Sequence, residues 1–326
     1  ETESVPGGMC RLIPDERLDK SVLDTDIDFL RSLGNIEIYT DVHLYSPEVL
    51  LDEYDGVIAA AGRDKEYRLN IKGEDYAYTW IDYLRNHKKS KFKNLRVAVA
   101  GGGAVALDAA VTAKLNGASS VEMFCLEKFD EMPLTDAERQ LVLRHGIEIS
   151  GRAKVDSING ISKPEGKRIK SIVTSKVILQ PKEKFHPAKI KSDKKSNPQT
   201  RQFDAVIIAI GSGSSLDVKK KKSIFYAGDI VNGPTTVVEA VASGKNCAAE
   251  VDAYLNNLPK PLIKKRVKSR VVLDGRRMIP VPLETDFFGR KILSPFILSA
   301  APPSDGYEQM KKAYEAGWAG GVMKTA

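Results

Sequence analysis

The sequence predicts an α/β fold, and two observations support that prediction. First, an apolar run at residues 97–100 ends in a cluster of glycines and passes into an alanine-rich helical segment at 104–115. Second, a strand-like motif occurs at residues 54–62 and again at 203–211, each reading aromatic-Asp-small-Val-Ile-x-Ala-x-Gly. Such apolar runs are typical of parallel strands buried on both faces. The repeat indicates either two buried strands that end in small residues or, as we expect, the closing strands of two successive nucleotide-binding domains.

The glycine cluster is typical of a turn that binds a dinucleotide pyrophosphate. Gly101 permits the tight turn, Gly103 lets the pyrophosphate approach the backbone, and the small Ala106 lets the helix pack on its strand. The anion would meet free N–H groups at the positive end of the helix dipole. Glu127 ends the next apolar run 24 positions beyond Gly103, near the separation at which an acid reaches the adenosine ribose. The alternative is a βαβ unit that only packs. The candidate dinucleotide residues are Gly101, Gly102, Gly103, Ala104, Val105, Ala106, Glu127 and Gly211.

Local signals predict the other elements. Asn116 and Gly117 end the helix at 104–115, and Gly34 ends an amphipathic helix at 20–33. Thr135 is a good N-cap for a helix at 135–145. Pro234 and the threonines beside it favour a helix start near 237, with an end near 255. Short strands are predicted at residues 36–39, 121–126, 147–149, 169–179 and 224–229.

Composition excludes several classes of function. The 326 residues are 42% hydrophobic, without an apolar run of the length that spans a membrane and without a signal peptide, so we expect a cytoplasmic globular protein. The net charge of +7 is concentrated at 182–201, 219–222 and 260–270, where interleaved aromatic residues are few. We interpret these segments as solvated loops and a linker, not as a nucleic-acid surface. No metal site and no iron–sulfur ligands are expected from the scattered cysteines and histidines, which are Cys10, Cys125, Cys247, His43, His87, His145 and His186.

In this order the pieces resemble the FAD- and NAD(P)-dependent oxidoreductases whose pyridine-nucleotide domain is inserted into the flavin domain. Within that group the sequence is similar to the glutamate synthase small subunit and to the homologous region of dihydropyrimidine dehydrogenases. The resemblance covers residues 1 to about 255 and implies two nested Rossmann-like domains. The segments that carry it are Pro6-Gly7-Gly8, Ile13-Pro14-Asp15-x-Arg17-Leu18, Tyr54-Asp55-Gly56-Val57, residues 101–110, Glu131-Met132-Pro133, residues 203–211 and Tyr226-Ala227-Gly228-Asp229.

The resemblance implies how FAD would be held. Asp229 would accept a hydrogen bond from the ribityl chain, although a turn cap is the alternative. A helix N-terminus at 235–237 would stabilise the reduced isoalloxazine, so hydride transfer needs no catalytic side chain. Glu1 would bind the FAD ribose. The glycine loop of the FAD site is expected about 20 residues upstream of Glu1, outside this sequence. We therefore expect either a fragment or a chain that has lost part of the FAD site. The candidate FAD residues are Glu1, Gly7, Gly8, Gly62, Gly228, Asp229, Thr235, Thr236 and Val237.

The segment 279–326 is similar to the opening of the FMN-binding barrel of dihydroorotate and dihydropyrimidine dehydrogenases. By that resemblance Ser299, Ala300, Lys324 and Thr325 would line FMN. Only 48 residues of a (β/α)₈ barrel of about 250 are present, so we expect an incomplete barrel. The predicted domains are the first part of the FAD domain, the NAD(P) domain, the second part of the FAD domain, a linker and the barrel start, at residues 1–90, 91–218, 219–256, 257–278 and 279–326.

This domain order favours the dihydropyrimidine dehydrogenase family. The intact enzyme would pass electrons from NAD(P)H through FAD and iron–sulfur clusters to FMN and then to uracil or thymine. The alternatives are an electron-input subunit of a glutamate synthase-like complex and a degenerate nucleotide-binding scaffold, for which the short lysine-rich link at 211–224 argues weakly. The expected partners are a nicotinamide dinucleotide, a pyrimidine substrate, and a second copy or an iron–sulfur subunit, with no nucleic acid and no membrane.

The residues after the 121–126 run bear on the choice of nicotinamide cofactor. Relatives that use NADP carry an arginine pair near Leu126 and Glu127, and a carboxylate there would repel a 2′-phosphate. Ala106 and Lys128 favour NADP instead. We expect NAD(H) to be preferred over NADP(H), and we expect this chain to bind NAD(H) more readily than it retains FAD.

Overall fold

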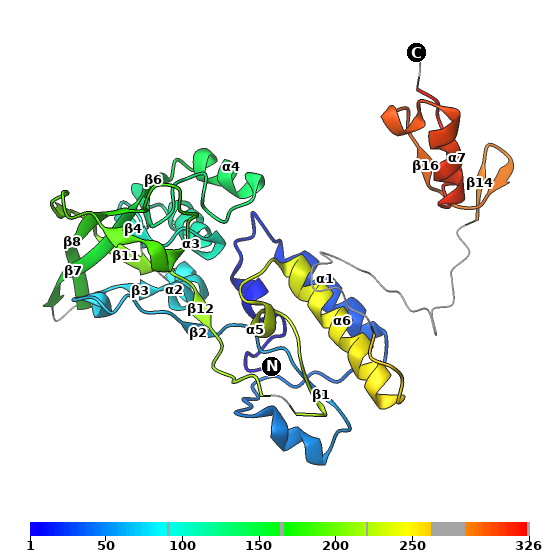
Figure 1. Ribbon diagram of the computed structural model, residues 1–326, viewed down its shortest axis with the longest axis horizontal. Helices are drawn as coiled ribbons and strands as arrows, with labels where there is room; N and C mark the ends of the chain where they lie inside the picture. Colours follow the sequence, from blue (N-terminus) through cyan, green and yellow to red (C-terminus); the bar gives the residue numbers. More distant parts are fainter. Residues whose placement is uncertain (90–91, 164–165, 220, 262–283, 325–326) are drawn as a thin grey trace. The chain divides into compact units, whose positions relative to one another are not determined.

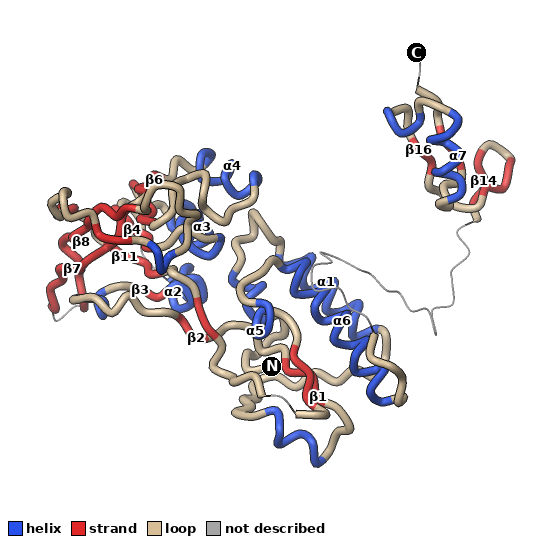
Figure 2. The backbone as a smooth tube through the Cα atoms, viewed as in Figure 1, coloured by secondary structure: helices blue, strands red, loops and turns tan. Residues whose placement is uncertain are grey.

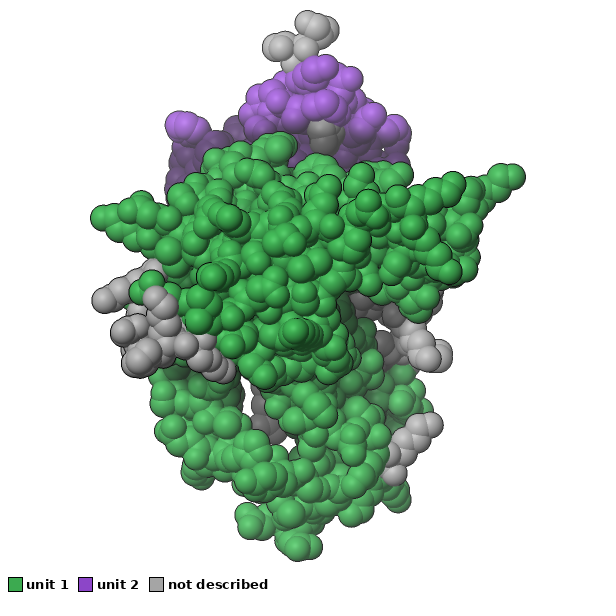
Figure 3. All heavy atoms as spheres, turned by 90° about the vertical axis from the view of Figure 1, so that its left-hand side faces the viewer, with its two compact units in different colours: residues 1–271 green, residues 272–326 purple. Residues whose placement is uncertain are grey.

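The structure is a computed structural model that describes residues 1–89, 92–163, 166–219, 221–261 and 284–324 (Figure 1). The chain divides into two compact units, residues 1–271 and 272–326, which Figure 3 colours separately. The larger unit holds the predicted dinucleotide turn.

A five-stranded parallel sheet forms the centre of the larger unit, in the order β3-β11-β4-β5-β6 (Figure 2). Its strands are β3 (Tyr78–Thr79), β4 (Arg96–Ala100), β5 (Ser120–Cys125), β6 (Glu148–Gly151) and β11 (Ala205–Ile208). Helices α2 (Trp80–Asn86), α3 (Ala104–Leu115) and α4 (Asp136–Arg144) share one hydrophobic core with this sheet.

Both faces of the sheet are buried, each by a different layer. Successive residues of a strand point to opposite faces of the sheet, so each strand contributes side chains to both layers. On β4, Val97 and Val99 pack into the core with the helices. Ala98 and Ala100 pack instead with an antiparallel sheet, whose strands are β7 (Ala153–Lys163), β8 (Gly166–Ile178), β9 (Lys191–Ser192) and β10 (Gln199–Arg201). The result is three layers, with the parallel sheet in the middle.

A separate two-stranded parallel sheet joins segments that lie on either side of this domain in the sequence. Its strands are β1 (Val57–Ala59) and β13 (Ile224–Tyr226), with Val57 opposite Ile224. The chain therefore leaves this sheet, builds the five-stranded domain and returns. Between the two regions it passes through β2 (Lys65–Glu66) and β12 (Ser212–Gly213), which pair antiparallel.

Helices and turns accompany the β1–β13 pair in the sequence. They are α1 (Lys20–Ser32), α5 (Asp229–Asn232), α6 (Val237–Leu255) and the 3₁₀ turns η1 (Gly8–Leu12) and η2 (Pro47–Asp52). Of these, η2 contacts β1 and α6 contacts β13. Three further 3₁₀ turns complete the unit, η3 (Glu74–Tyr76), η4 (His87–Lys89) and η5 (Pro187–Lys189). Within the described residues, no helix is both long and apolar enough to cross a bilayer.

The smaller unit contains a hairpin followed by a βαβ segment. The hairpin is β14 (Thr285–Phe287) and β15 (Arg290–Ile292). Next come β16 (Ile297–Leu298), the turn η6 (Pro302–Ser304), α7 (Tyr307–Glu315) and β17 (Gly320–Gly321), with β16 and β17 parallel. One strand-helix-strand repeat is consistent with a barrel start, which stays a prediction. Most of the predicted linker at 257–278 lies outside the described residues.

One prediction about this fold needs correction. Residues 36–39 form no strand, and this extended stretch is held only by isolated bonds, such as the N-terminal amine of Glu1 donating to the Tyr39 carbonyl at 3.0 Å. Near the predicted domain boundary at residue 90, β3 pairs with β11 and α2 packs against α3. The five-stranded domain therefore begins near Tyr78.

Candidate functional site

The glycine turn links β4 to α3 at the carboxyl edge of the parallel sheet. Gly101 has a φ of 142°, and its N–H donates to the Phe124 carbonyl at 2.9 Å. A Cβ at this position would lie 2.1 Å from the carbonyl oxygen of Ala209, so only glycine fits between β5 and β11. Gly211, with a φ of 104°, lies two residues beyond Ala209, where the chain enters β12.

The rest of the turn leaves space at the start of α3. Gly103 is the N-cap of α3 without a side-chain cap, and no atom lies within 4 Å of where its Cβ would be. Free N–H groups at a helix start attract anions. Ala104 and Val105 form the first turn of α3 and are half-buried, whereas Ala106 is fully buried against the sheet. The space beside Gly103 at the start of α3 is therefore open.

Glu127 lies beside this turn. A Cβ on Gly102 would be 2.6 Å from Glu127 Oε2, so the absence of a side chain at 102 makes room for the carboxylate. Burial raises the pKa of Glu127, and the nearby Arg152 partly offsets this rise. The predicted acid and the predicted glycine turn thus come together at one edge of the sheet.

Arg152 is a residue of this site that the sequence did not single out. Its guanidinium donates to the Leu126 carbonyl at 2.6 Å and pairs with Glu131 at 2.7 Å, while its N–H donates to the Glu127 carbonyl at 3.1 Å. Arg152 has a φ of 53° and directly follows β6. It therefore holds the loop that carries Glu127 in place.

The candidate flavin residues form two groups. In the first, Glu1 Oε2 lies 4.0 Å from where a Cβ of Gly8 would be, and Gly7 and Gly8 have φ values of 124° and 49°. A Cβ on Gly7 would lie 3.1 Å from Arg11 Nε. The N-terminal acid and the first glycine pair are thus neighbours.

The second group lies at the carboxyl ends of β1 and β13. Gly62 and Gly228 both have positive φ and open space at the Cβ position. Asp229 follows, and it accepts a hydrogen bond from Thr235 Oγ1 at 2.5 Å. Thr236 caps α6 in a reciprocal capping box with Glu239, so that Val237 is the first residue of the helix. The predicted helix start is confirmed.

The candidate FMN residues of the smaller unit also share an edge. Ser299 and Ala300 follow β16, and Lys324 follows β17, which is parallel to β16. The N–H of Lys324 donates to the Ser304 carbonyl at 3.1 Å. Thr325 lies outside the described residues. Across the part of the chain that the structure describes, no three His, Cys, Asp or Glu side chains form a group that could hold a metal ion.

Comparisons with known proteins agree with this geometry. The family model described as pyridine nucleotide-disulphide oxidoreductase matches residues 38–244. The structure of Mycobacterium tuberculosis FprA in complex with NADPH shares the fold, with a TM-score of 0.61 and 15% identity over 79% of this chain and 77% of that one.

Three curated relatives match across most of the chain. The NADP(+)-dependent formate dehydrogenase subunit beta of Moorella thermoacetica is 28% identical over 78% of this chain and 40% of its own length. The NAD-dependent dihydropyrimidine dehydrogenase subunit PreT of Escherichia coli K12 is 26% identical over 78% and 61%. The glutamate synthase [NADPH] small chain of the same strain is 26% identical over 74% and 60%.

The chain thus spans between about two fifths and three fifths of these relatives. The family model covers well over half of the chain. The matched residues include the glycine turn, Glu127 and the β2–β12 pair, through which the chain crosses between the β1–β13 sheet and the five-stranded domain. The family match supports binding of FAD and a nicotinamide dinucleotide. From its sequence and its fold, this chain belongs to the pyridine nucleotide-disulphide oxidoreductase family.

Proposed function

We propose that this chain is the electron-entry segment of a flavoenzyme and accepts a hydride from NAD(P)H onto FAD. The observation that carries the proposal is the glycine turn, open at Gly103 and bordered by the carboxylate of Glu127. When both cofactors are bound, they supply the redox chemistry, in which the hydride leaves the nicotinamide ring for the flavin ring. The protein's own residues bind and orient them.

The dinucleotide would bind along the carboxyl edge of the parallel sheet. The first N–H groups of α3 would hold the pyrophosphate, with room provided by Gly103. Glu127 would accept hydrogen bonds from ribose hydroxyls and repel a 2′-phosphate. This supports NAD(H) over NADP(H), although Ala106 and the exposed Lys128 favour NADP. Arg152, the arginine near Glu127 that could pair with a 2′-phosphate, is already paired with Glu131.

FAD would lie along the N-terminal part of the unit. Glu1 would bind the adenosine ribose beside Gly8, and Asp229 would bind the ribityl chain next to Gly62 and Gly228. The N-terminus of α6 would face the isoalloxazine and stabilise its reduced, anionic form. No side-chain acid or base is required in this arrangement.

The domain order extends the proposal to the whole protein. Residues 1 to about 77 and 219–256 would form a split FAD domain, and the parallel-sheet domain between them would bind the dinucleotide. Residues 279–326 would begin an FMN barrel, with iron–sulfur clusters elsewhere in the full-length protein and a pyrimidine as the final acceptor. The PreT relative, named as a dihydropyrimidine dehydrogenase subunit, supports this. The glutamate synthase small chain supports the alternative of an electron-input subunit.

NADH oxidation by the purified full-length protein tests the proposed function. The expected result is a bound-flavin absorption band and oxidation of NADH faster than NADPH with an artificial electron acceptor. Uracil or thymine as acceptor distinguishes the pyrimidine enzyme from an input subunit. A flavin-free protein that oxidises neither nucleotide would contradict the proposal and favour the scaffold.

A further inference from the structure

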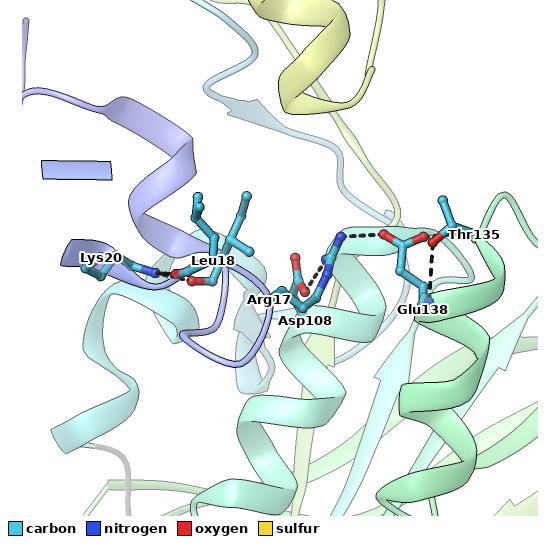
Figure 4. A network of polar contacts seen from close by, with 7 residues as sticks. Arg17, Leu18, Lys20, Asp108, Thr135 and Glu138 are labelled. Atoms are coloured by element: carbon cyan, nitrogen blue, oxygen red, sulfur yellow. Dashed lines mark hydrogen bonds and ion pairs between the residues drawn. The ribbon is translucent and has the colours of Figure 1, made fainter. Parts of the chain in front are cut away.

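One polar cluster joins the N-terminal segment to the five-stranded domain. Arg17 donates to Asp108 Oδ1 at 2.5 Å and also pairs with Glu138 (Figure 4). The side chains of Asp108 and Glu138 are only 7% and 10% exposed, and that of Arg17 is 21% exposed. Both carboxylates are thus withdrawn from water and held by one guanidinium.

Glu16 makes a second connection from the same turn. Its carboxylate lies 2.6 Å from His145 Nε2 and 3.1 Å from Arg144 Nη1, at the end of α4. Arg17 contacts the first turn of the same helix through Glu138. We call Glu16, Arg17, Asp108, Glu138, Arg144 and His145 the Arg17 clamp.

Hydrogen bonds within the N-terminal segment hold the turn that carries Arg17. The N–H groups of Arg17 and Leu18 both donate to the Pro14 carbonyl, at 2.8 and 3.0 Å. Lys20 Nζ donates to the carbonyls of Ile13 and Leu18 (Figure 4). A movement of this turn would therefore carry the guanidinium with it.

The far side of the clamp is coupled to the dinucleotide turn. Asp108 is the fifth residue of α3, one helical turn beyond the open N-terminus at Gly103. Glu138 completes the capping box of α4, because its other oxygen accepts the Thr135 N–H at 2.7 Å. Arg17 thus bridges the starts of two helices of the dinucleotide domain.

The near side is coupled to the candidate flavin residues. Arg11 donates to the Pro6 carbonyl at 2.6 Å and pairs with Asp24 at 2.7 Å, which ties the Gly7-Gly8 turn to α1. The N–H of Cys10 donates to the Gly7 carbonyl at 3.2 Å, and the N–H of Ile13 donates to the Cys10 carbonyl at 3.3 Å. The segment that leads to Arg17 is therefore connected to the Gly7-Gly8 turn of the first flavin group.

The two crossings between these regions are joined to each other. Arg63 Nε donates to the Ser212 carbonyl at 2.6 Å, and the N–H of Ser215 donates to Asp64 at 2.8 Å. Because β2 and β12 also pair, the two crossings are held side by side. The Arg17 clamp contacts α3 and α4, away from the crossings, so a rotation of one region relative to the other would break its ion pairs.

We propose that Arg17 is a positioning residue that fixes how the nicotinamide-binding and flavin-binding regions face each other for hydride transfer. This inference rests on the proposed function. Among the described residues, the side chain of Arg17 pairs with Asp108 and Glu138 and not with the glycine turn or Glu127, so Arg17 acts through these two carboxylates. Its loss should therefore change the geometry of transfer more than the binding of the dinucleotide.

Flavin reduction by NADH in the full-length protein tests this role. For Arg17→Gln we expect the limiting rate at saturating NADH to fall by at least about tenfold, since small misplacements of reacting groups cost this much. The NADH concentration for half-maximal rate should change less than twofold. Arg17→Lys, which keeps the charge but not the two-armed geometry, should recover part of the rate. Arg31→Gln, which removes an exposed arginine of α1 paired with Asp28, is the matched control.

Hydrogen exchange supplies a readout that does not depend on bound cofactors. Exchange at residues 61–68 and 211–216, which include the crossings, should be several times faster in Arg17→Gln and Arg17→Lys than in wild type and Arg31→Gln. If wild type proves to lack flavin, the proposed function fails but this measurement still tests the clamp. Unchanged exchange, or a rise in the NADH requirement with an unchanged limiting rate, would overturn the role of Arg17.

Discussion

Gly101 and Gly103 lie two residues apart but are glycines for different reasons. Gly101 is required by the fold, since a Cβ would meet the Ala209 carbonyl at 2.1 Å and its φ is 142°. Gly103 meets nothing within 4 Å and has an ordinary extended φ of −93°. The fold would tolerate a small side chain at position 103, whereas the proposed pyrophosphate site needs the space that glycine leaves open.

This contrast gives a matched pair of variants. Gly101→Ala should lower the free energy of unfolding by roughly 2 kcal/mol or more, from backbone strain and overpacking. Gly103→Ala should leave stability within about 0.5 kcal/mol but weaken NADH binding, because the methyl group occupies the phosphate space. Denaturant unfolding and NADH titration of both variants check this. Equal NADH affinity for Gly103→Ala and wild type would contradict the assigned role.

Glu127 should determine the choice between NADH and NADPH. Glu127→Gln removes the charge that repels a 2′-phosphate and keeps the shape of the side chain. We expect the preference for NADH over NADPH to fall by about tenfold, since one charge-assisted interaction contributes about 1.4 kcal/mol or more. Ratios of kcat/KM for the two nucleotides measure it. Glu148→Gln, an exposed carboxylate on β6, is the control, and an unchanged ratio in Glu127→Gln would refute the prediction.

At the scale of elements, the buried ion pair of α3 makes stability depend on pH. Burial raises the pKa of Asp108 to about 6 from an ordinary value of 3.8, although Arg17 lowers it in part. Between these values the native state holds a proton that the unfolded chain has released, so the free energy of unfolding falls as pH rises. The total change is on the order of 3 kcal/mol.

Asp108→Asn should flatten this dependence. The variant cannot titrate at this position, so its free energy of unfolding should change less than that of wild type between pH 4 and pH 6. Its stability at any one pH also reflects the loss of one partner of Arg17, so the slope is the informative quantity. Asp136→Asn, at a fully exposed carboxylate of α4, is the control. Parallel slopes for Asp108→Asn and wild type would count against a raised pKa.

The elements that could be predicted are those with local signals. The helix at Ala104–Leu115 has its glycine turn before it and Asn116 after it, and Thr135 and Thr236 cap α4 and α6 as expected. The strand β3 has only two residues and pairs with Ile207 and Ile208, far along the chain. No local pattern marks such a strand, so its place in the five-stranded sheet could not be predicted from the sequence.

The same contrast between local and long-range signals applies to the residues of the candidate site. Gly101, Gly103 and Glu127 follow a spacing set by one βαβ unit, so the sequence was enough to group them. Arg152 and Arg17 contribute through the fold: Arg17 reaches Asp108 across 91 positions. Ion pairs between distant segments depend on how the two regions dock, and periodicity and caps carry no information about docking.

For the whole molecule, the central feature is a strand pair that encloses the parallel-sheet domain in the sequence. Strand β1 precedes this domain, β13 follows it, and the two strands are hydrogen-bonded to each other. The two regions each present open glycines at the carboxyl end of a strand, at Gly103 and at Gly228. In the proposed function, two cofactor sites in regions joined by the β2–β12 pair would pass electrons between the bound nucleotides. The proposed function depends on both sites being used together.

Anaerobic mixing of the full-length protein with NADH, followed at the flavin absorption band, measures hydride transfer from the dinucleotide to the flavin. We expect NADH to bleach the band within one turnover and NADPH to do so more slowly. Gly103→Ala should lose the fast bleaching while retaining its flavin. A flavin band that NADH leaves unchanged, or bleaching of equal rate in Gly103→Ala, would contradict the proposed function.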